Sequence, residues 1–221
     1  MKVCTDSCLF GAWIAAKIAK RYLDPKRILD IGTGTGLLSL LLAQKTDARI
    51  DAVEITDEAF NQSKENFSAS PWSEKITAYH ADIKSWNAPS KYDLLICNPP
   101  FFENDLLPPD DGKNIAKHGS KLLLEDLLKI VAKLLAEEGS FCVLLPSQRA
   151  DWFQEIAEAY SLHVTERMDV KQTVDHDYFR SMLILKKNPS QLSTYTMSIK
   201  NDGNGYTPEF VELLKDYYLY L

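Results

Sequence analysis

The sequence lacks features that mark membrane, secreted or metal-dependent proteins. Its longest apolar runs, at 36–43 and 141–146, are far shorter than the roughly 20 residues that a membrane helix needs, and no leader pattern precedes them. The four cysteines form no CxxC pair and have no histidine at zinc-finger spacing. We therefore expect a cytoplasmic protein with free thiols, no membrane contact and no bound metal.

An excess of basic residues is also missing. The chain has 25 Lys and Arg against 31 Asp and Glu, a net charge of −6, which argues against nonspecific coating of nucleic acid. A local basic patch is still compatible with this balance. Between 149 and 187, basic residues that include Lys171 and Arg180 alternate with aromatic ones, and a plain solvated face explains that pattern equally well.

The chain is long enough for one domain with its own core, because it has 221 residues of which 45% are hydrophobic. We expect a single domain at 1–221. Within it we predict an N-terminal helix or cap at 1–25, a core at 26–187 and a C-terminal extension at 188–221.

Hydrophobic periodicity alternates between helices and strands along the chain. A helix is predicted at 8–23, with Asp6 or Ser7 as its N-cap, and further helices near 37–44, 57–68, 122–135 and 151–160. Seven strands are predicted, at 27–32, 49–55, 76–83, 92–97, 140–146, 162–170 and 179–186. Strands separated by helices indicate an α/β fold with a mostly parallel sheet, helices on both faces and one antiparallel strand at the end.

Polar features follow the first four predicted strands. The loop from Asp30 to Gly36 ends the first, Glu54 the second, Asp82 the third and Asn98 the fourth. In an open α/β sheet, ligands bind beyond the carboxyl ends of the strands. We therefore expect these residues to form one ligand site.

The glycine loop fits neither of two common nucleotide motifs. A P-loop needs Gly-Lys-Ser/Thr, and the dinucleotide fingerprint needs a glycine at position 37, where this chain has Leu37. What remains is D-x-G-x-G-x-G, with Gly32, Gly34 and Gly36 at alternate positions. Such a loop lets the backbone approach a ligand closely, and Asp30 suits a cationic amino-acid group better than a pyrophosphate.

The acids at the next two strand ends suit a nucleoside. Glu54 is placed to accept hydrogen bonds from ribose hydroxyls, and Asp82 to accept one from an exocyclic adenine amine. Taken alone, each acid is more often a surface or capping residue. Their order behind the glycine loop favours the functional interpretation.

The series "LDIGTGTG", "AVEI", "HADI" and "DLLICNPPFF" resembles the class I S-adenosylmethionine-dependent methyltransferases, in the branch with an Asn-Pro-Pro-aromatic tetrad. The resemblance implies a Rossmann-like fold with a seven-stranded sheet. It also implies that S-adenosylmethionine is the cofactor and S-adenosylhomocysteine the product. The cofactor-binding residues implied are Asp30, Gly32, Thr33, Gly34, Gly36, Glu54, Ile55, Asp82, Ile83 and Asn98.

Both flanks resemble bacterial members that methylate N6 of adenine 37, beside the anticodon of valine tRNA. The stretches are "MKVCTDSCLFGAW" and "YTPEFVELLKDYYLYL", and the first departs from the family pattern at Cys4, Ser7 and Cys8, where glycine or valine is more usual. This resemblance implies a tRNA substrate and no obligate protein partner. Candidate substrate contacts are Lys2, Thr5, Phe102, Lys171 and Arg180.

The tetrad Asn98-Pro99-Pro100-Phe101 suits methylation of an exocyclic amine. An exocyclic amine is a poor nucleophile because its lone pair is delocalised into the ring. The Asn98 side-chain oxygen and the Pro99 carbonyl can each accept one N–H and so localise that pair, while the prolines fix the loop. Phe101 or Phe102 offers a ring on which the base stacks.

Other planar amines suit the same tetrad, so alternative substrates stay open. These are guanine N2 of ribosomal RNA, a protein glutamine amide and adenine in DNA; DNA and glutamine methylases normally carry additional regions absent from 221 residues. A noncatalytic cofactor-binding partner protein is a further alternative. The segment 103–119, long and rich in turn formers, is predicted to gate the substrate.

Overall fold

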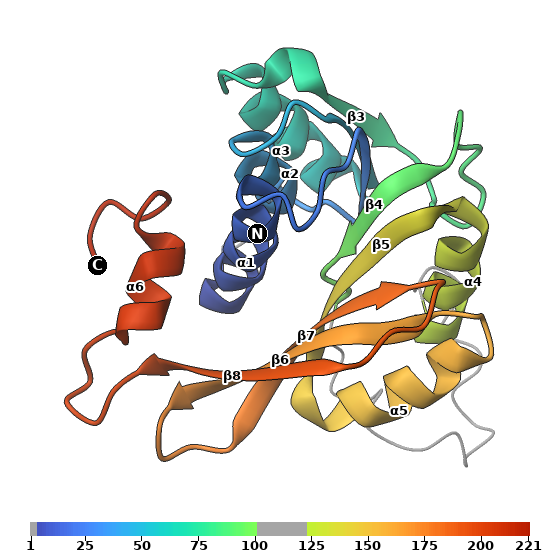
Figure 1. Cartoon of the computed structure of the whole chain (residues 1–221). Coiled ribbons are helices and arrows are strands. Elements are labelled where there is room, and N and C mark those ends of the chain that lie inside the picture. The colour runs from blue at the N-terminus through green and yellow to red at the C-terminus, as the bar shows by residue number, and fades with distance from the viewer. Residues whose placement is uncertain (1–3, 101–122) are drawn as a thin grey trace, which may run out of the picture.

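The computed structural model describes residues 4–100 and 123–221, so the predictions for Lys2, Phe101, Phe102 and the segment 103–119 lie outside the described residues. The chain folds around an eight-stranded sheet with the order β3-β2-β1-β4-β5-β7-β6-β8 (Figure 1). The strands are β1 (Arg27–Ile31), β2 (Arg49–Glu54), β3 (Ile76–His80), β4 (Tyr92–Cys97), β5 (Leu135–Pro146), β6 (His163–Thr173), β7 (Tyr178–Lys186) and β8 (Ser193–Lys200). The helices are α1 (Thr5–Ala19), α2 (Leu37–Ala43), α3 (Asp57–Ser68), α4 (Leu124–Leu134), α5 (Ser147–Glu158) and α6 (Pro208–Leu214), with a 3-10 turn at Ser73–Lys75.

The predicted strand directions are confirmed, but the predicted number of strands was wrong by one. β7 runs antiparallel to both of its neighbours, β5 and β6, while the other described strands are parallel to one another. The eighth strand, β8, pairs in parallel with β6 at the edge of the sheet. Its residues 193–196 are exposed, so this strand lacks the apolar run by which a buried strand is recognised.

Two hydrophobic clusters cover the two faces of the sheet. One cluster joins α1, α2, α6 and Phe67 of α3, and the other joins α4 and α5. The central strands contribute to both clusters, since neighbouring residues such as Ile28 and Leu29 of β1 point to opposite faces and are fully buried. Burial on both faces explains why these strands read as continuous apolar runs.

Helix α1 begins and ends earlier than its periodicity predicts. It begins at Thr5 with Cys4 at the cap position, so Asp6 and Ser7, which were expected to cap the helix, lie in its first turn. It ends at Ala19, and Arg21 just beyond has a φ of 57°, a left-handed conformation that stops a helix. The polar first turn of α1 is therefore available for contacts elsewhere in the fold.

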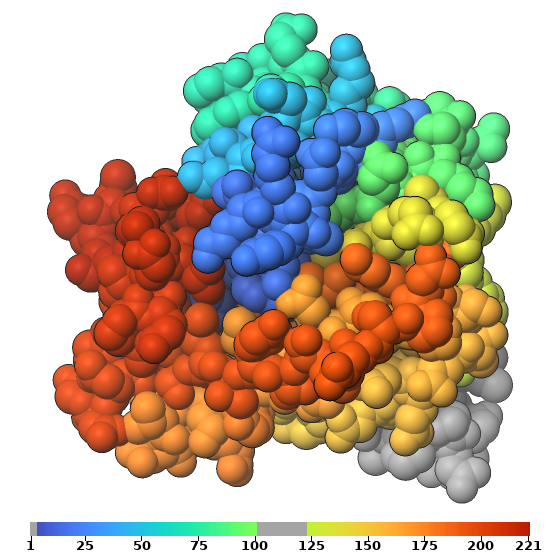
Figure 2. All heavy atoms as spheres, viewed as in Figure 1, coloured from blue at the N-terminus to red at the C-terminus, as the bar shows by residue number. Residues whose placement is uncertain are grey.

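The N-terminal helix lies beside the last helix of the chain. α6 packs against α1, and both contribute to the same hydrophobic cluster (Figure 1). In Figure 2 the N-terminal segment (blue) occupies the middle of the visible face, between the C-terminal segment (red) and the segment that includes β4 (green). No helix of the described residues is long and apolar enough to cross a membrane.

Candidate active site

The polar features that follow the first four strands lie at one edge of the sheet. β3, β2, β1 and β4 are adjacent and parallel, and Ile31 at the end of β1 pairs with Val53 of β2 and Cys97 of β4. Glu54 and His80 pair at the ends of β2 and β3. We refer to this side as the carboxyl edge. The fold therefore gathers the glycine loop, Glu54, Asp82 and Asn98 as the sequence predicts.

The glycine loop crosses from β1 to α2 and is fastened to β2. The backbone N–H groups of Gly32 and Thr33 both donate to the Val53 carbonyl, at 2.9 and 3.1 Å. Gly32 and Gly36 have φ angles of 68° and 87°, which L side chains rarely adopt. The two glycines face different surroundings: a Cβ on Gly32 would have no atom within 4 Å, whereas a Cβ on Gly36 would lie 2.3 Å from the Phe67 ring.

Asp30 combines deep burial with an unused oxygen. Its side chain is 1% exposed, and its Oδ2 accepts hydrogen bonds from Thr33 Oγ1 at 2.6 Å and from Ser39 Oγ at 2.7 Å. Its Oδ1 has no hydrogen-bond partner among the described residues. Burial raises the pKa of Asp30, while the hydrogen bonds from Thr33 and Ser39 oppose that rise. A buried, unpaired carboxylate oxygen beside an open loop fits a ligand ammonium group.

Glu54 ties the glycine loop to the start of α3. The carboxylate is 7% exposed; Oε2 accepts from the Gly34 N–H at 2.9 Å, and Oε1 from the N–H groups of Ile55 and Thr56 at 3.0 and 2.9 Å. Because Oε2 accepts one hydrogen bond within the described structure and each carboxylate oxygen can accept two, it has capacity for a ribose hydroxyl. The position of Glu54 in the sequence predicted that it binds a ligand, but not that it also holds the glycine loop through these backbone hydrogen bonds.

Three further residues predicted to bind the cofactor, Ile55, Asp82 and Ile83, differ in exposure. Ile55 is 44% exposed, whereas Ile83 is 8% exposed and belongs to the hydrophobic cluster that includes α4. Asp82 is half-buried, and its Oδ1 accepts a hydrogen bond from the Lys84 N–H at 2.9 Å, as a turn-capping residue does. Their roles toward a ligand stay predictions.

Asn98 directly follows β4, and only the nitrogen of its side-chain amide is hydrogen-bonded within the described residues. Its Nδ2 donates to Ser7 Oγ in the first turn of α1 at 2.8 Å, and its Oδ1 is buried without a hydrogen-bond partner among the described residues. Pro99 is buried and Pro100 is exposed. Nothing in the sequence indicated Ser7 as a partner of Asn98, because the two residues are 91 positions apart.

Three of the predicted substrate contacts lie within the described residues. Arg180 pairs with Pro146 at the carboxyl end of β5, and its Nε contacts Asp6 Oδ2 of α1 at 2.7 Å. Lys171, near the end of β6, lies over the Tyr178 ring at 5.1 Å from its centroid. Thr5 is exposed at the start of α1. All three are near the carboxyl edge, and their roles stay predictions.

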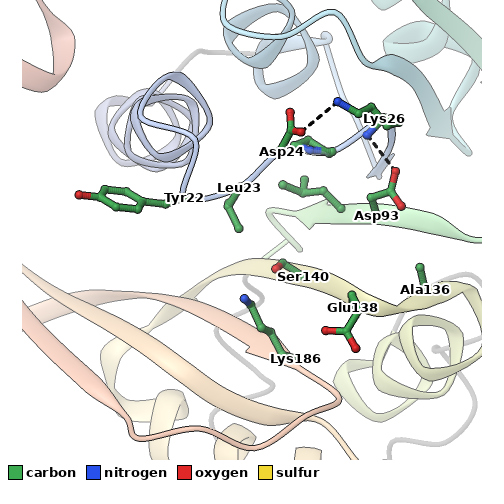
Figure 3. Close-up of a pocket in the computed structure, with 11 residues that line it drawn as sticks. Tyr22, Leu23, Asp24, Lys26, Asp93, Ala136, Glu138, Ser140 and Lys186 are labelled. Carbon is green, nitrogen blue, oxygen red and sulfur yellow. Dashed lines mark hydrogen bonds and ion pairs between the residues drawn. The ribbon is translucent and has the colours of Figure 1, made fainter.

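A cavity of about 250 Å³ lies at the opposite edge of the sheet (Figure 3). Its lining comes from the segment before β1, the beginning of β4, the first half of β5 and the end of the antiparallel β7. The labelled charged residues there are Asp24, Lys26, Asp93, Glu138 and Lys186. This cavity is therefore separate from the glycine loop and Asn98.

The fold and the residues at the carboxyl edge define a methyltransferase. The family model described as Methyltransferase small domain matches residues 12–144. The tRNA1(Val) (adenine(37)-N6)-methyltransferase of Dyadobacter fermentans is 41% identical over 99% of this chain and 91% of its own length, and that of Bacteroides thetaiotaomicron is 37% identical over 100% and 92%. The chain belongs to the tRNA1(Val) (adenine(37)-N6)-methyltransferase family.

Solved structures with lower sequence identity share the fold. A predicted O-methyltransferase from Agrobacterium tumefaciens superposes with a TM-score of 0.71 at 16% identity, over 94% of both chains. A putative RNA methyltransferase from Pyrococcus horikoshii superposes with a TM-score of 0.59 at 17% identity, over 81% of this chain and 82% of its own. These likenesses support the Rossmann-like methyltransferase fold.

Proposed function

We propose that this protein transfers a methyl group from S-adenosylmethionine to N6 of adenine 37 in valine tRNA, in the cytoplasm. The observation that carries the chemistry is Asn98 Oδ1 at the carboxyl edge, which is buried and has no hydrogen-bond partner among the residues that the structure describes. The substrate is proposed from the names of relatives that match nearly the whole chain.

The residues of the glycine loop and its neighbours fit the cofactor. Asp30 Oδ1 would take the ammonium group, Glu54 the ribose hydroxyls and Asp82 the adenine amine, while Gly32 leaves open space for the ligand. When bound, S-adenosylmethionine supplies an electrophilic methyl group on a sulfonium sulfur. Thr33, Gly34 and Gly36 would hold the loop in shape around it, and Ile55 and Ile83 would flank the adenine. No metal is needed for this chemistry.

The tetrad after β4 prepares the amine of the base. Asn98 Oδ1 and the Pro99 carbonyl each accept one N–H of the exocyclic amine, which directs the nitrogen lone pair away from the ring. Placing both acceptors on a rigid Pro-Pro segment means that little reorganisation accompanies the reaction. Phe101, outside the described residues, is proposed to stack on the base.

We expect S-adenosylhomocysteine, which carries the same ammonium group, to bind more weakly as the pH falls through the raised pKa of Asp30. The ammonium group requires an ionised Asp30, whose pKa is raised by burial. Below that raised pKa, binding must release the proton, and affinity falls by up to about tenfold per pH unit. Isothermal titration calorimetry measures both the affinity and the released proton. Asp30→Asn is the control, in which the pH dependence should disappear.

The raised pKa of Asp30 also affects the stability of the ligand-free protein, and there the dependence on pH has the opposite sign. Because the folded-state pKa of Asp30 is raised, its contribution to stability is full below the unfolded-state pKa and is lost as pH rises through the folded-state value. Wild-type affinity that does not fall with decreasing pH over the range in which the protein stays folded, or an equal slope in Asp30→Asn, would contradict the proposed ammonium site.

The proposed substrate is tested by transfer of labelled methyl to separate pools of unmodified tRNA, ribosomal RNA, duplex DNA and cell protein. Nucleoside or residue analysis then identifies the product. We expect N6-methyladenosine in tRNA, at position 37 of valine tRNA. Label as N2-methylguanosine in ribosomal RNA, or on protein glutamine, keeps the amine chemistry and replaces the substrate.

Lys171, Arg180, Thr5, Lys2 and Phe102 are proposed to contact the tRNA. Cation–π pairs add aromatic surface to the described part of this region, namely Lys171 over Tyr178 and Arg149 over Trp152. Such pairs suit the phosphates and unstacked bases of an anticodon loop.

In the methyl-transfer experiment, cofactor binding with no transfer to any of the four pools would instead favour the alternative of a noncatalytic partner protein.

A further inference from the structure

We propose that Ser7 is a positioning residue that holds the Asn98 amide with its oxygen available to the substrate amine. This inference rests on the proposed function, because it assigns the group that orients one of the two acceptors. It is carried by one contact, the hydrogen bond from Asn98 Nδ2 to Ser7 Oγ at 2.8 Å, and by the buried Oδ1, which has no partner within residues 4–100 and 123–221.

An asparagine amide has two ends of nearly equal shape and opposite hydrogen-bonding character. Rotating the Asn98 amide by half a turn would exchange Oδ1 for Nδ2 and present N–H donors to the N–H donors of the substrate amine. The two orientations have nearly the same shape, so in this chain the hydrogen bond from Nδ2 is what distinguishes them. Ser7 Oγ is the partner of Nδ2 in the described structure.

The unpartnered oxygen makes this orientation informative. A buried carbonyl oxygen without a donor costs free energy, because it has lost its hydrogen bonds to water and gained none in return. An N–H donor on the substrate amine would satisfy Asn98 Oδ1, so this orientation favours binding of an amine. The Ser7 contact recovers part of this cost by satisfying the other end of the amide.

Ser7 is itself held in place by contacts on both sides. The residue before it, Asp6, forms an ion pair with Arg180 of β7 at 2.7 Å, and the residues after it, Cys8 to Phe10, are buried in the core. The backbone N–H of Ser7 donates to Asp6 Oδ1 at 2.9 Å, which ties Ser7 to the side chain that pairs with Arg180. The first turn of α1 thus presents a fixed acceptor to Asn98.

The first test compares Ser7→Ala with Ser7→Thr in methyl transfer to unmodified tRNA. Removing one hydrogen bond that orients the amide should lower kcat by about 3- to 10-fold. The KM for tRNA, the affinity for S-adenosylhomocysteine and the thermal midpoint should change little. Ser7→Thr keeps the hydroxyl and should restore most of kcat. Equal kcat in Ser7→Ala and wild type, or an equal loss in Ser7→Thr, overturns the proposal.

A double-mutant cycle separates positioning from a general effect of α1. If Ser7 acts through Asn98, then Ser7→Ala should cause no further loss of kcat in the Asn98→Ala background. The same factor of loss in both backgrounds would show that Ser7 acts by another route.

A readout without substrate keeps this inference distinct from the proposed function. In ¹⁵N-labelled protein, the side-chain NH₂ signals of Asn98 are identified by their absence in Asn98→Ala. They should shift in Ser7→Ala and stay near their wild-type position in Ser7→Thr, and unchanged signals in Ser7→Ala would overturn the contact. If the wild type transfers no methyl to tRNA, the proposed function fails, and these spectra still decide whether Ser7 holds Asn98.

Discussion

Replacing Asn98 with alanine is expected to lower kcat by about 100- to 1,000-fold, the loss typical of removing one preorganised hydrogen-bonding group from a transition state. The variant loses the side-chain oxygen that accepts an N–H of the substrate amine, so the lone pair of that amine stays delocalised. Pro99 still supplies its carbonyl, which leaves a measurable residual rate. Single-turnover transfer of labelled methyl to unmodified tRNA measures the effect on the chemical step.

Fold stability and cofactor affinity should change little in the same variant. The substitution removes the hydrogen bond to Ser7, but it also removes a buried oxygen that has no partner in the described part of the chain, and these two effects oppose each other. Asn61→Ala, at an exposed position of α3, is a matched control. An unchanged kcat in Asn98→Ala would refute the proposed role of the amide. Lost cofactor binding would show that Asn98 acts on the ligand of the glycine loop.

Alanine at Gly36 is expected to lower the stability of the fold by about 3 kcal/mol, through left-handed backbone strain and overpacking together. The φ angle of Gly36 is 87°, and an added Cβ would lie 2.3 and 2.7 Å from two atoms of the Phe67 ring. Phe67 belongs to the core cluster, so the ring has little freedom to move away. For a chain of this length, the loss corresponds to a fall in Tm of roughly 6–12 °C.

Gly32→Ala is the matched comparison for Gly36→Ala. Gly32 also has a positive φ, but a Cβ there would meet no atom within 4 Å. We expect strain alone, about 1 kcal/mol, and a Tm lowered by roughly 2–4 °C. Because the Cβ enters the open space proposed for the cofactor, this variant should lose most of its affinity for S-adenosylhomocysteine. Similar melting of the two variants, or unchanged affinity in Gly32→Ala, would contradict this division of roles.

The positions of the site at the ends of β1 to β4 could be predicted because each depends on local information. A strand that stops at Glu54 or Asn98 is visible within a few residues, and the parallel order of the strands then brings their ends together. The single antiparallel strand was predicted correctly for the same reason, because its sequence signal is also local. By contrast, the sequence does not distinguish Gly32 from Gly36, although Gly32 faces open space and Gly36 faces Phe67.

Contacts between distant parts of the chain were not predicted, for a physical reason. Ser7 meets Asn98 across 91 positions and Asp6 meets Arg180 across 174, and neither pair leaves a periodic signal. Such contacts are settled by tertiary packing. The strand β8 was missed for a different reason: Tyr195, Met197 and Ile199 alternate with polar residues, which is a local strand signal, but its exposed first half has no apolar run.

The packing of α6 on α1 joins an early segment of the chain to a late one. During translation, α1 is made long before α6 (Pro208–Leu214), the helix that covers part of its apolar surface. A nascent chain therefore exposes that surface until α6 has left the ribosome, and a chain cut short before β8 never covers it. Because α1 also carries the turn that contacts Asn98, we expect such truncated chains to be aggregation-prone and poorly active.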